Sequence, residues 1–432
     1  MGENMVGENI YRLAGEIFPI CRSITGDGVR QTLKIIQKRL PSLNICEVDS
    51  GTKVLDWEIP DEWNIREAYI DNSKGERIID FKNNNLHVLG YAEPIDKYMT
   101  LAELKNIIYT QPDQPEVIPY VTSYYKRRTG FCMSDKQMKE LQEDTYHVCI
   151  DSSFSKGKLT YGEIIIPGET QKEVLLSSYI CHPSMANNEC SGPSLLTFVA
   201  QEIMKKRRKY TYRVIFVPET IGTITYLHYN LSTLKENVIA GYNLSCVGDN
   251  RMYSFVASKN EDTLSEKVLE KVLNDNRVKY KKYSFLQRGS DEKHYGMPGI
   301  DLPIVTFSRS KYGEYPEYHT SADNMNIISP EGFEGSFDVI MECLNIIEEN
   351  KIYAMNILGM PQLGKRNLYP SLSRKGIYDE ELMAMLNLMT YVDGKMDLLE
   401  VSERINYSCT KLIFIAEKLV KEKILREISD DK

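Results

Sequence analysis

Two histidines and a glutamate stand at positions where they could act together on a substrate. His182 follows the apolar run 174–180, Glu219 follows the apolar run 211–218, and His319 lies in a long aromatic loop. Neutral imidazoles bind metal ions, and a carboxylate can accept a proton from metal-bound water. In open α/β sheets ligands bind beyond the carboxyl ends of the strands, so we expect these side chains to share one crevice. The pattern predicts an enzyme, or a protein descended from one.

Each of these residues also has a structural interpretation. His182 could be a hydrogen-bonded structural histidine, although the polar loop 185–192 after it favours a metal ligand. Glu219 could cap a helix that begins at Ile221, but a carboxylate at the end of a buried strand is costly unless a proton, a metal or a donor accompanies it. The loop 308–319 could be a packed surface loop rather than a pocket wall. The sequence leaves these alternatives open.

The region from about 149 to 350 alternates strand-like and helix-like patterns. Such alternation is typical of an α/β fold with a mainly parallel mixed sheet and helices on both faces. A third apolar run, 238–248, ends at Asp249, and Asp291 precedes a strand expected near 302–307, so both aspartates could face the same crevice. We expect helices over 192–209, 221–234 and 262–276, and a further helix that starts at Ser329-Pro330-Glu331.

The flanking regions differ from this core. Residues 1–45 show helical spacing, and residues 46–148 combine short strand-like runs with turn motifs. After residue 364 three short helices and a strand are expected at 379–391, 398–405, 408–423 and 424–428. We therefore predict a catalytic domain formed by 1–45 and 149–364, an inserted β-rich domain at 46–148, and a winged helix-turn-helix domain at 365–432. The third helix of the last domain lacks a basic stripe, which favours protein contact over DNA binding.

Composition limits the function classes. A formal net charge of -8 argues against nucleic-acid binding by the chain as a whole. No apolar run approaches the roughly 20 residues needed to span a bilayer, and residues 1–10 are polar, so we expect a cytoplasmic protein with no membrane segment. The nine cysteines are scattered without a CxxC pair, which suits reduced thiols in that compartment.

At these residues the chain resembles the zinc aminopeptidase clan that includes bacterial leucyl aminopeptidases and glutaminyl cyclases. The matching motifs are His182, Ser191-Gly192, Glu219, Gly289-Ser290-Asp291 and His319. The resemblance implies a zinc exopeptidase-like fold in which the two histidines bind zinc and Glu219 acts as the general base.

The chain also departs from that family. The metal-bridging aspartate of the family falls on Asn188, the second glutamate of its Glu-Glu pair on Thr220, and its later aspartate on Ser245 or Asp249. Amide and hydroxyl oxygens replace carboxylates poorly around zinc. We therefore expect one zinc ion rather than two, held by His182, Asn188 and His319, with Glu189 or Asp249 as further candidate ligands; a site without metal is the alternative.

Nearly the full length resembles a little-studied group of bacterial proteins in which an aminopeptidase-like domain carries a β-rich insertion and a C-terminal winged helix. The segments that carry this likeness are 13–33, 57–65 and 311–324. The expected function is metal-dependent hydrolysis of a peptide or other amide bond, including a small amide such as an acylated amino sugar. The alternative is a catalytically inactive binding or regulatory protein that acts on a protein or nucleic-acid partner through its winged helix. Either protein could form oligomers.

Overall fold

The computed structural model describes residues 6–368 and 379–428. They form two compact units, one comprising residues up to Thr263 with Tyr280–Phe337, the other Leu264–Lys279 with the residues from Asp338 on. Residues 1–5 of the predicted catalytic domain, and 369–378 and 429–432 of the predicted winged helix, lie outside the described residues. The predicted domain boundaries stay a prediction.

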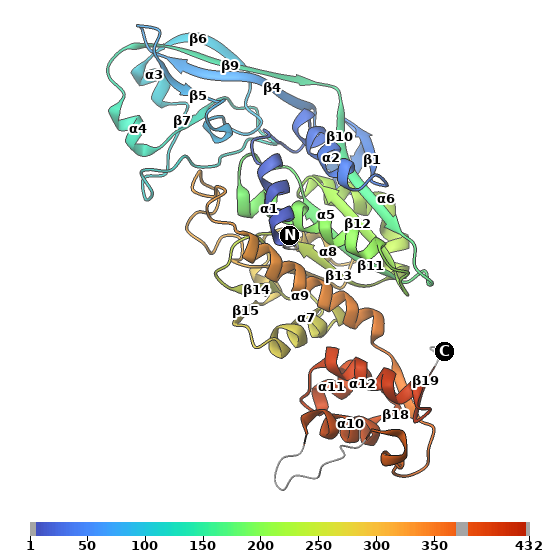
Figure 1. Ribbon diagram of the computed structural model, residues 1–432. Helices are drawn as coiled ribbons and strands as arrows, with labels where there is room; N and C mark the ends of the chain where they lie inside the picture. Colours follow the sequence, from blue (N-terminus) through green and yellow to red (C-terminus); the bar gives the residue numbers. More distant parts are fainter. Residues whose placement is uncertain (1–5, 369–378, 429–432) are drawn as a thin grey trace. The chain divides into compact units, whose positions relative to one another are not determined.

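An eight-stranded mixed sheet forms the centre of the first unit (Figure 1), in the order β1-β10-β12-β11-β13-β16-β14-β15. Its strands are β1 (Asn44–Asp49), β10 (Lys158–Ile166), β11 (Glu173–Tyr179), β12 (Thr211–Val217), β13 (Val238–Leu244), β14 (Tyr253–Val256), β15 (Tyr280–Tyr283) and β16 (Ile304–Ser308). The central strands β12, β11, β13 and β16 pair in parallel. Strand β11 is buried along its whole length, as expected of a strand covered on both faces. The predicted mixed α/β sheet is confirmed.

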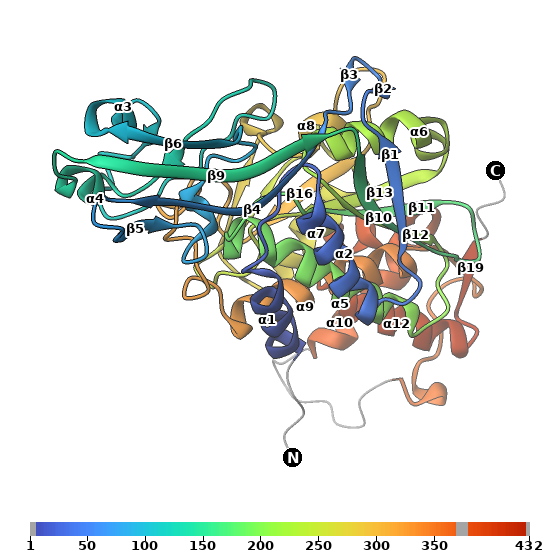
Figure 2. The ribbon, with the colours of Figure 1, turned by 90° about the horizontal axis from the view of Figure 1, so that it is seen from above.

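Helices cover both faces of this sheet (Figure 2). They are α1 (Val6–Ile17), α2 (Asp27–Arg39), α5 (Ser191–Met204), α6 (Ile221–Asn237), α8 (Glu292–Tyr295) and α9 (Pro330–Glu349), the last of which continues into the second unit. Tyr161 of β10 packs edge-on against Tyr226 of α6, with ring centroids 5.7 Å apart. A Cβ on the next residue, Gly162, would lie 2.8 Å from Leu33 of α2. Since neighbouring strand residues point to opposite faces, α6 and α2 lie on opposite faces.

The inserted region folds around its own antiparallel sheet, in the order β5-β4-β9-β6. These strands are β5 (Arg77–Asp80), β4 (Glu62–Asp71), β9 (Thr145–Ser155) and β6 (Ile95–Thr100). Shorter elements are β2 (Lys53–Val54), β3 (Trp57–Glu58), β7 (Ile108–Tyr109), β8 (Phe131–Cys132), α3 (Leu101–Lys105) and α4 (Asp135–Glu140). One face of the sheet packs on a separate apolar cluster that includes Phe131 and Val148. The β-rich prediction for this region agrees with the strands observed.

One strand ends earlier than its apolar run. The run 238–248 predicted a strand that reaches Asp249, but β13 ends at Leu244. Cys246 has a φ of +54°, a left-handed conformation that a strand cannot contain. Asp249 therefore lies in a loop beyond the strand rather than at its end.

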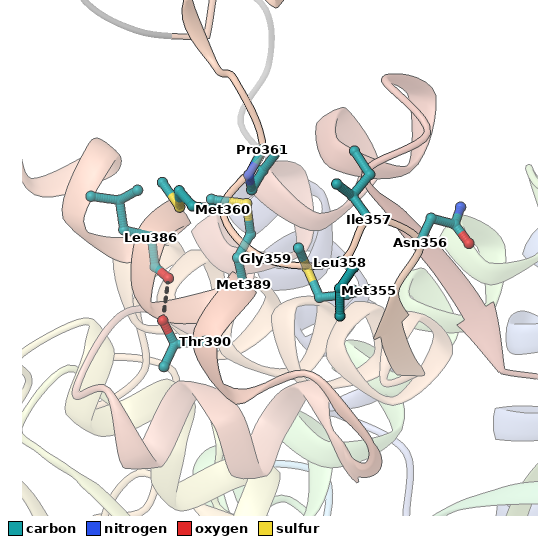
Figure 3. Close-up of a pocket in the computed structure, with 10 residues that line it drawn as sticks. All are labelled: Met355, Asn356, Ile357, Leu358, Gly359, Met360, Pro361, Leu386, Met389 and Thr390. Carbon is teal, nitrogen blue, oxygen red and sulfur yellow. Dashed lines mark hydrogen bonds between the residues drawn. The ribbon is translucent and has the colours of Figure 1, made fainter.

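The second unit contains a winged helix-turn-helix together with α7 (Leu264–Asp275) and the C-terminal part of α9. Its other elements are β17 (Ile352–Met355), α10 (Glu380–Tyr391), β18 (Asp393–Asp397), α11 (Leu398–Arg404), α12 (Cys409–Lys421) and β19 (Leu425–Ile428). Its three-stranded sheet has the order β18-β17-β19. Beside β17 and α10 is an apolar cavity of about 660 Å³, lined in part by Met355, Met360 and Met389 (Figure 3). Among the described helices of both units, none combines the length and apolar character needed to cross a bilayer.

Candidate active site

His182 stands just beyond β11, with its ring almost completely buried. Its Nδ1 lies 2.9 Å from Glu189 Oε2, and its Nε2 lies 3.6 Å from Glu219 Oε2. A carboxylate only accepts hydrogen bonds, so Nδ1 carries the proton and Nε2 keeps its lone pair when the ring is neutral. The hydrogen bond to Glu189 thus orients the ring, as in sites where a carboxylate orients a metal-binding histidine. Burial opposes protonation of His182, but Cys181 and Glu189 outweigh it and raise the pKa of His182 well above its ordinary value, so a metal ion would bind Nε2 in place of a proton.

Glu189 is itself held by a buried arginine. Arg22 Nε lies 3.4 Å from Glu189 Oε1 and donates to the His182 carbonyl oxygen at 2.9 Å. The side chains of Arg22 and Glu189 are both fully buried. A second guanidinium nitrogen, Nη1, donates to the carbonyl of Ile17 at 2.5 Å, so the arginine connects α1 to the histidine loop. Sequence reasoning missed this role, because Arg22 appeared only as part of a matched segment.

Glu219 follows β12, and its side chain is directed toward His182. Ser290 Oγ donates to Glu219 Oε1 at 2.9 Å, and the backbone N–H of Glu219 donates to Cys181 Sγ at 3.2 Å. The carboxylate therefore points to the histidine rather than back onto α6, the helix that it could have capped. This geometry suits a proton acceptor and disfavours the helix-capping interpretation.

Asp291 lies against Glu219 and is completely buried. The backbone N–H of Thr220 donates to Asp291 Oδ1 at 2.8 Å, with Thr220 at a φ of +66°, which is strained for a β-branched residue. Burial, and then the negative charge of Glu219, raise the pKa of Asp291 to about 8. Near neutral pH, Asp291 is therefore mainly a neutral acid beside Glu219. The expectation that Asp291 could face the crevice is met.

His319 closes the group from the loop after β16. Its ring centroid lies 5.6 Å from that of His182, and its ring stacks on Tyr318 at 3.9 Å. Its Nε2 is buried, and no group in the described part of the chain forms a hydrogen bond with it. Burial, followed by the charge of His182, lowers the pKa of His319 to about 3. The ring is thus a neutral imidazole with an unused lone pair, the form that binds a metal ion.

Two tyrosines of the inserted region form a wall of the site. The Tyr120 ring lies 5.2 Å from the His182 ring and 5.0 Å from the His319 ring, and its hydroxyl lies 2.5 Å from that of Tyr124. Burial raises the pKa of both phenols well above the ordinary value, so both stay neutral. The sequence analysis did not predict them. The tyrosine-rich stretch 120–125 was the one feature that could have suggested them.

The loop before α5 is fixed by buried acids. Asn188 Oδ1 accepts a hydrogen bond from Tyr179 at 3.1 Å, while Asn188 N donates to Asp323 Oδ2 at 3.0 Å. Asp249 Oδ2 accepts a hydrogen bond from Asn187 Nδ2 at 3.0 Å and another from Ser310 N at 2.9 Å. The amide oxygen of Asn188 and the carboxylate of Asp249 are therefore engaged in loop contacts. His182, Glu219, His319 and Asp291 come together, whereas Asn188 and Asp249 hold the surrounding loops.

Two sets of donors could hold a metal ion. Cys181, His182 and Glu189 offer ligand atoms within 4.8 Å of one another. However, Glu189 faces Arg22, and burial raises the pKa of Cys181 to about 11, which keeps the thiol neutral. The other set is the pair His182 and His319, whose ring centroids lie 5.6 Å apart, with the Glu219 carboxylate beside His182. Imidazoles suit zinc, but among the described residues only the first set brings three donor atoms within 4.8 Å of one another.

The sheet and the residues beyond its strand ends define an aminopeptidase-like α/β protein with a winged helix. A zinc aminopeptidase from Bacillus subtilis shares this fold, with a TM-score of 0.57 and 12% identity over 79% of this chain and 95% of its own. The chain belongs to the DUF4910 family, described as a domain of unknown function, whose model matches residues 11–350, and residues 351–427 match a winged helix-turn-helix model.

A protein and a crystal structure from Clostridium acetobutylicum each match almost the whole chain. A protein named as a polysaccharide biosynthesis protein with aminopeptidase-like domain is 44% identical over 421 residues, which is 97% of this chain and 96% of that protein. A crystal structure described as that of a peptidase gives a TM-score of 0.92 at 43% identity, over 98% of this chain and 97% of the other.

Proposed function

We propose that this protein is a metal-dependent hydrolase of an amide bond. The observation that carries the proposal is the buried Nε2 of His319, which has no hydrogen-bond partner among the described residues, on a ring whose centroid lies 5.6 Å from that of His182. The Nε2 of His182 in turn lies 3.6 Å from the Glu219 carboxylate. His182 and His319 would hold one zinc ion, and Glu219 would lie beside it. When bound, the ion supplies a water whose pKa is low enough for it to lose a proton near neutral pH.

The remaining steps belong to side chains of the chain itself. Glu219, directed by Ser290, accepts the proton of the attacking water and returns it to the nitrogen of the departing amine. Asp291, neutral near pH 7, adds no second full charge beside Glu219. Tyr120 and Tyr124 exclude water from the face of the two imidazole rings.

The relative's name bears on the substrate. A polysaccharide biosynthesis protein with an aminopeptidase-like domain favours an acylated amino sugar over a peptide as the amide. A second candidate function, a non-catalytic peptidase-fold binding protein, is favoured by Asn188, whose amide oxygen is engaged by Tyr179 where the related zinc enzymes carry a metal-bridging aspartate.

Metal content and turnover test the proposal. Wild-type protein should contain about one equivalent of zinc by mass spectrometry, and His319→Ala should lose it. His147→Ala is the matched control, because this histidine belongs to the inserted sheet and contacts Asp96. Glu219→Gln should keep zinc and fold but lose hydrolysis of a panel of N-acetyl amino sugars and aminoacyl amides. Metal-free wild type after zinc is supplied, or unchanged turnover in Glu219→Gln, would shift the assignment to the binding protein.

A further inference from the structure

A second cavity lies in the first unit, away from the histidine site. Its volume is about 440 Å³, within the range of small-molecule sites, roughly 300–1,000 Å³. One wall is the segment 19–31, which includes the start of α2, and the other wall comes from β4 and the residues after β5. The lining residues used below are Ser23, Asp27, Gln31, Ile65, Phe81 and Lys82. His182, Glu219 and His319 are not among the residues that line it.

Two positions in the first wall can hold only glycine, one for its backbone conformation and its space and the other for its space alone. Gly26 has a φ of +99°, and a Cβ there would lie 2.1 Å from the Trp63 carbonyl oxygen. A Cβ on Gly28 would lie 2.0 Å from the Cys21 carbonyl oxygen. Close approach of this kind requires glycine. Asn64 Oδ1 also accepts the Asp27 N–H at 2.8 Å, which joins the start of α2 to β4. The cavity walls are thus fixed by the backbone.

One buried hydroxyl in this wall forms no hydrogen bond with any described residue of the chain. Ser23 is 3% exposed, lines the cavity, and its Oγ has no hydrogen-bond partner. Buried polar atoms are nearly always hydrogen-bonded, and each exception calls for an explanation such as an absent ligand. Serine oxygen both donates and accepts, so it matches another hydroxyl.

The other lining groups restrict the ligand further. Asp27 is paired with Arg30 at 2.7 Å, and Lys82 lies 3.8 Å from Glu67, so the walls carry no uncompensated charge of either sign. The Gln31 amide offers both a donor and an acceptor. Phe81 and Ile65 add apolar surface. A ligand that fits must be neutral, rich in hydroxyls and partly apolar on one side.

We propose that this cavity binds a neutral monosaccharide in its pyranose form. Ring hydroxyls would pair with Gln31 and the free side of Asp27, and also with Ser23 once its enclosed Oγ rotates toward the cavity. The C–H face would pack on Phe81 and Ile65. A free amino acid fits less well, because its two charges would compete with Arg30 and Glu67 for Asp27 and Lys82. Asn85 lines the same cavity and donates to Ser184 Oγ at 2.7 Å, so one hydrogen bond links the cavity lining to the loop that carries His182. The inference does not depend on hydrolysis.

Saturation-transfer NMR with the full-length protein tests the inference. The probes are the methyl glycosides of glucose, galactose and mannose, with glycine as a zwitterionic probe. At least one glycoside should receive saturation, and Ser23→Ala should weaken its affinity roughly tenfold, the scale of one hydrogen bond. Ser194→Ala is the matched control, since Ser194 is equally buried in α5, has an unpartnered Oγ, and does not line the cavity. Removal of an unpaired hydroxyl should not lower the melting temperature in either variant.

Gln31→Ala, at an exposed position, provides a second variant that should also weaken binding. Binding should persist in Glu219→Gln, so loss of the proposed hydrolase would leave this result unaffected. Saturation of no glycoside, equal affinity in Ser23→Ala and Ser194→Ala, or preferential binding of glycine would each overturn the assignment.

Discussion

The buried acid Asp291 makes a quantitative prediction about stability and pH. Its pKa rises from the ordinary 3.8 to about 8 in the folded chain, first through burial and then through the charge of Glu219. Between these values the folded state holds a proton that the unfolded state has lost. Stability therefore falls as pH rises through this window, by at most about 1.4 kcal/mol per pH unit, and levels off above pH 8. From pH 5 to pH 8 the loss is on the order of 4 kcal/mol.

Asp291→Asn removes this titration and retains an oxygen that can accept the Thr220 N–H. The variant should therefore gain stability relative to wild type as pH rises from 5 to 8. Urea unfolding followed by tryptophan fluorescence measures the difference, because Trp57 and Trp63, the two tryptophans of the chain, both lie in the first unit. Asp113→Asn, at an exposed position, is the control and should track wild type at every pH.

The same measurement separates the two causes of the shift. Glu219→Gln removes the negative charge beside Asp291, so the pH window should move to lower pH while the slope persists. Parallel pH curves for wild type and Asp291→Asn would refute the reasoning, because they would mean that Asp291 titrates alike in the folded and unfolded states.

Two further predictions follow from the residues around His182. Arg22→Met should destabilise the first unit by about 3–5 kcal/mol, because Glu189 would remain buried without its cation. In urea unfolding, the double variant Arg22→Met with Glu189→Gln should recover much of that loss. Absence of recovery would argue against the pairing of Arg22 with Glu189. Tyr120→Phe should leave zinc content unchanged, since the ring still packs against both histidines. Tyr120→Ala should expose the histidines and lower zinc affinity. Equal zinc binding in both variants would show that the ring does not protect the site.

The core of this fold could be predicted from the sequence because strands buried on both faces have mostly apolar sequences. Strand β11 is buried along its whole length and its sequence is mostly apolar, so the residues after β11 and β12 could be placed at one edge of the sheet. The predicted proximity of His182 and Glu219 follows from that geometry. The end of β13 could not be predicted, because the turn depends on a left-handed Cys246 and not on a change in hydrophobicity.

The remaining parts of the site depend on contacts between distant segments. Arg22 meets the His182 carbonyl across 160 residues, and Tyr120 N donates to the His319 carbonyl at 2.8 Å from the inserted region. Neither contact has a local periodicity or motif that marks it. Both residues stand in segments whose pattern indicates only a loop, so their roles became apparent only in three dimensions.

The main-chain pairing between the inserted region and the His319 loop has an evolutionary consequence. Pro119 forms a bridge with Thr320, and Ser321 N donates to the Ile118 carbonyl, so these bonds flank a histidine whose φ is +56°. The unusual backbone of that histidine is thus supported by the insertion. Removal of the insertion would remove these contacts and alter the backbone of the His319 loop, so sequence changes in either segment are constrained by the other.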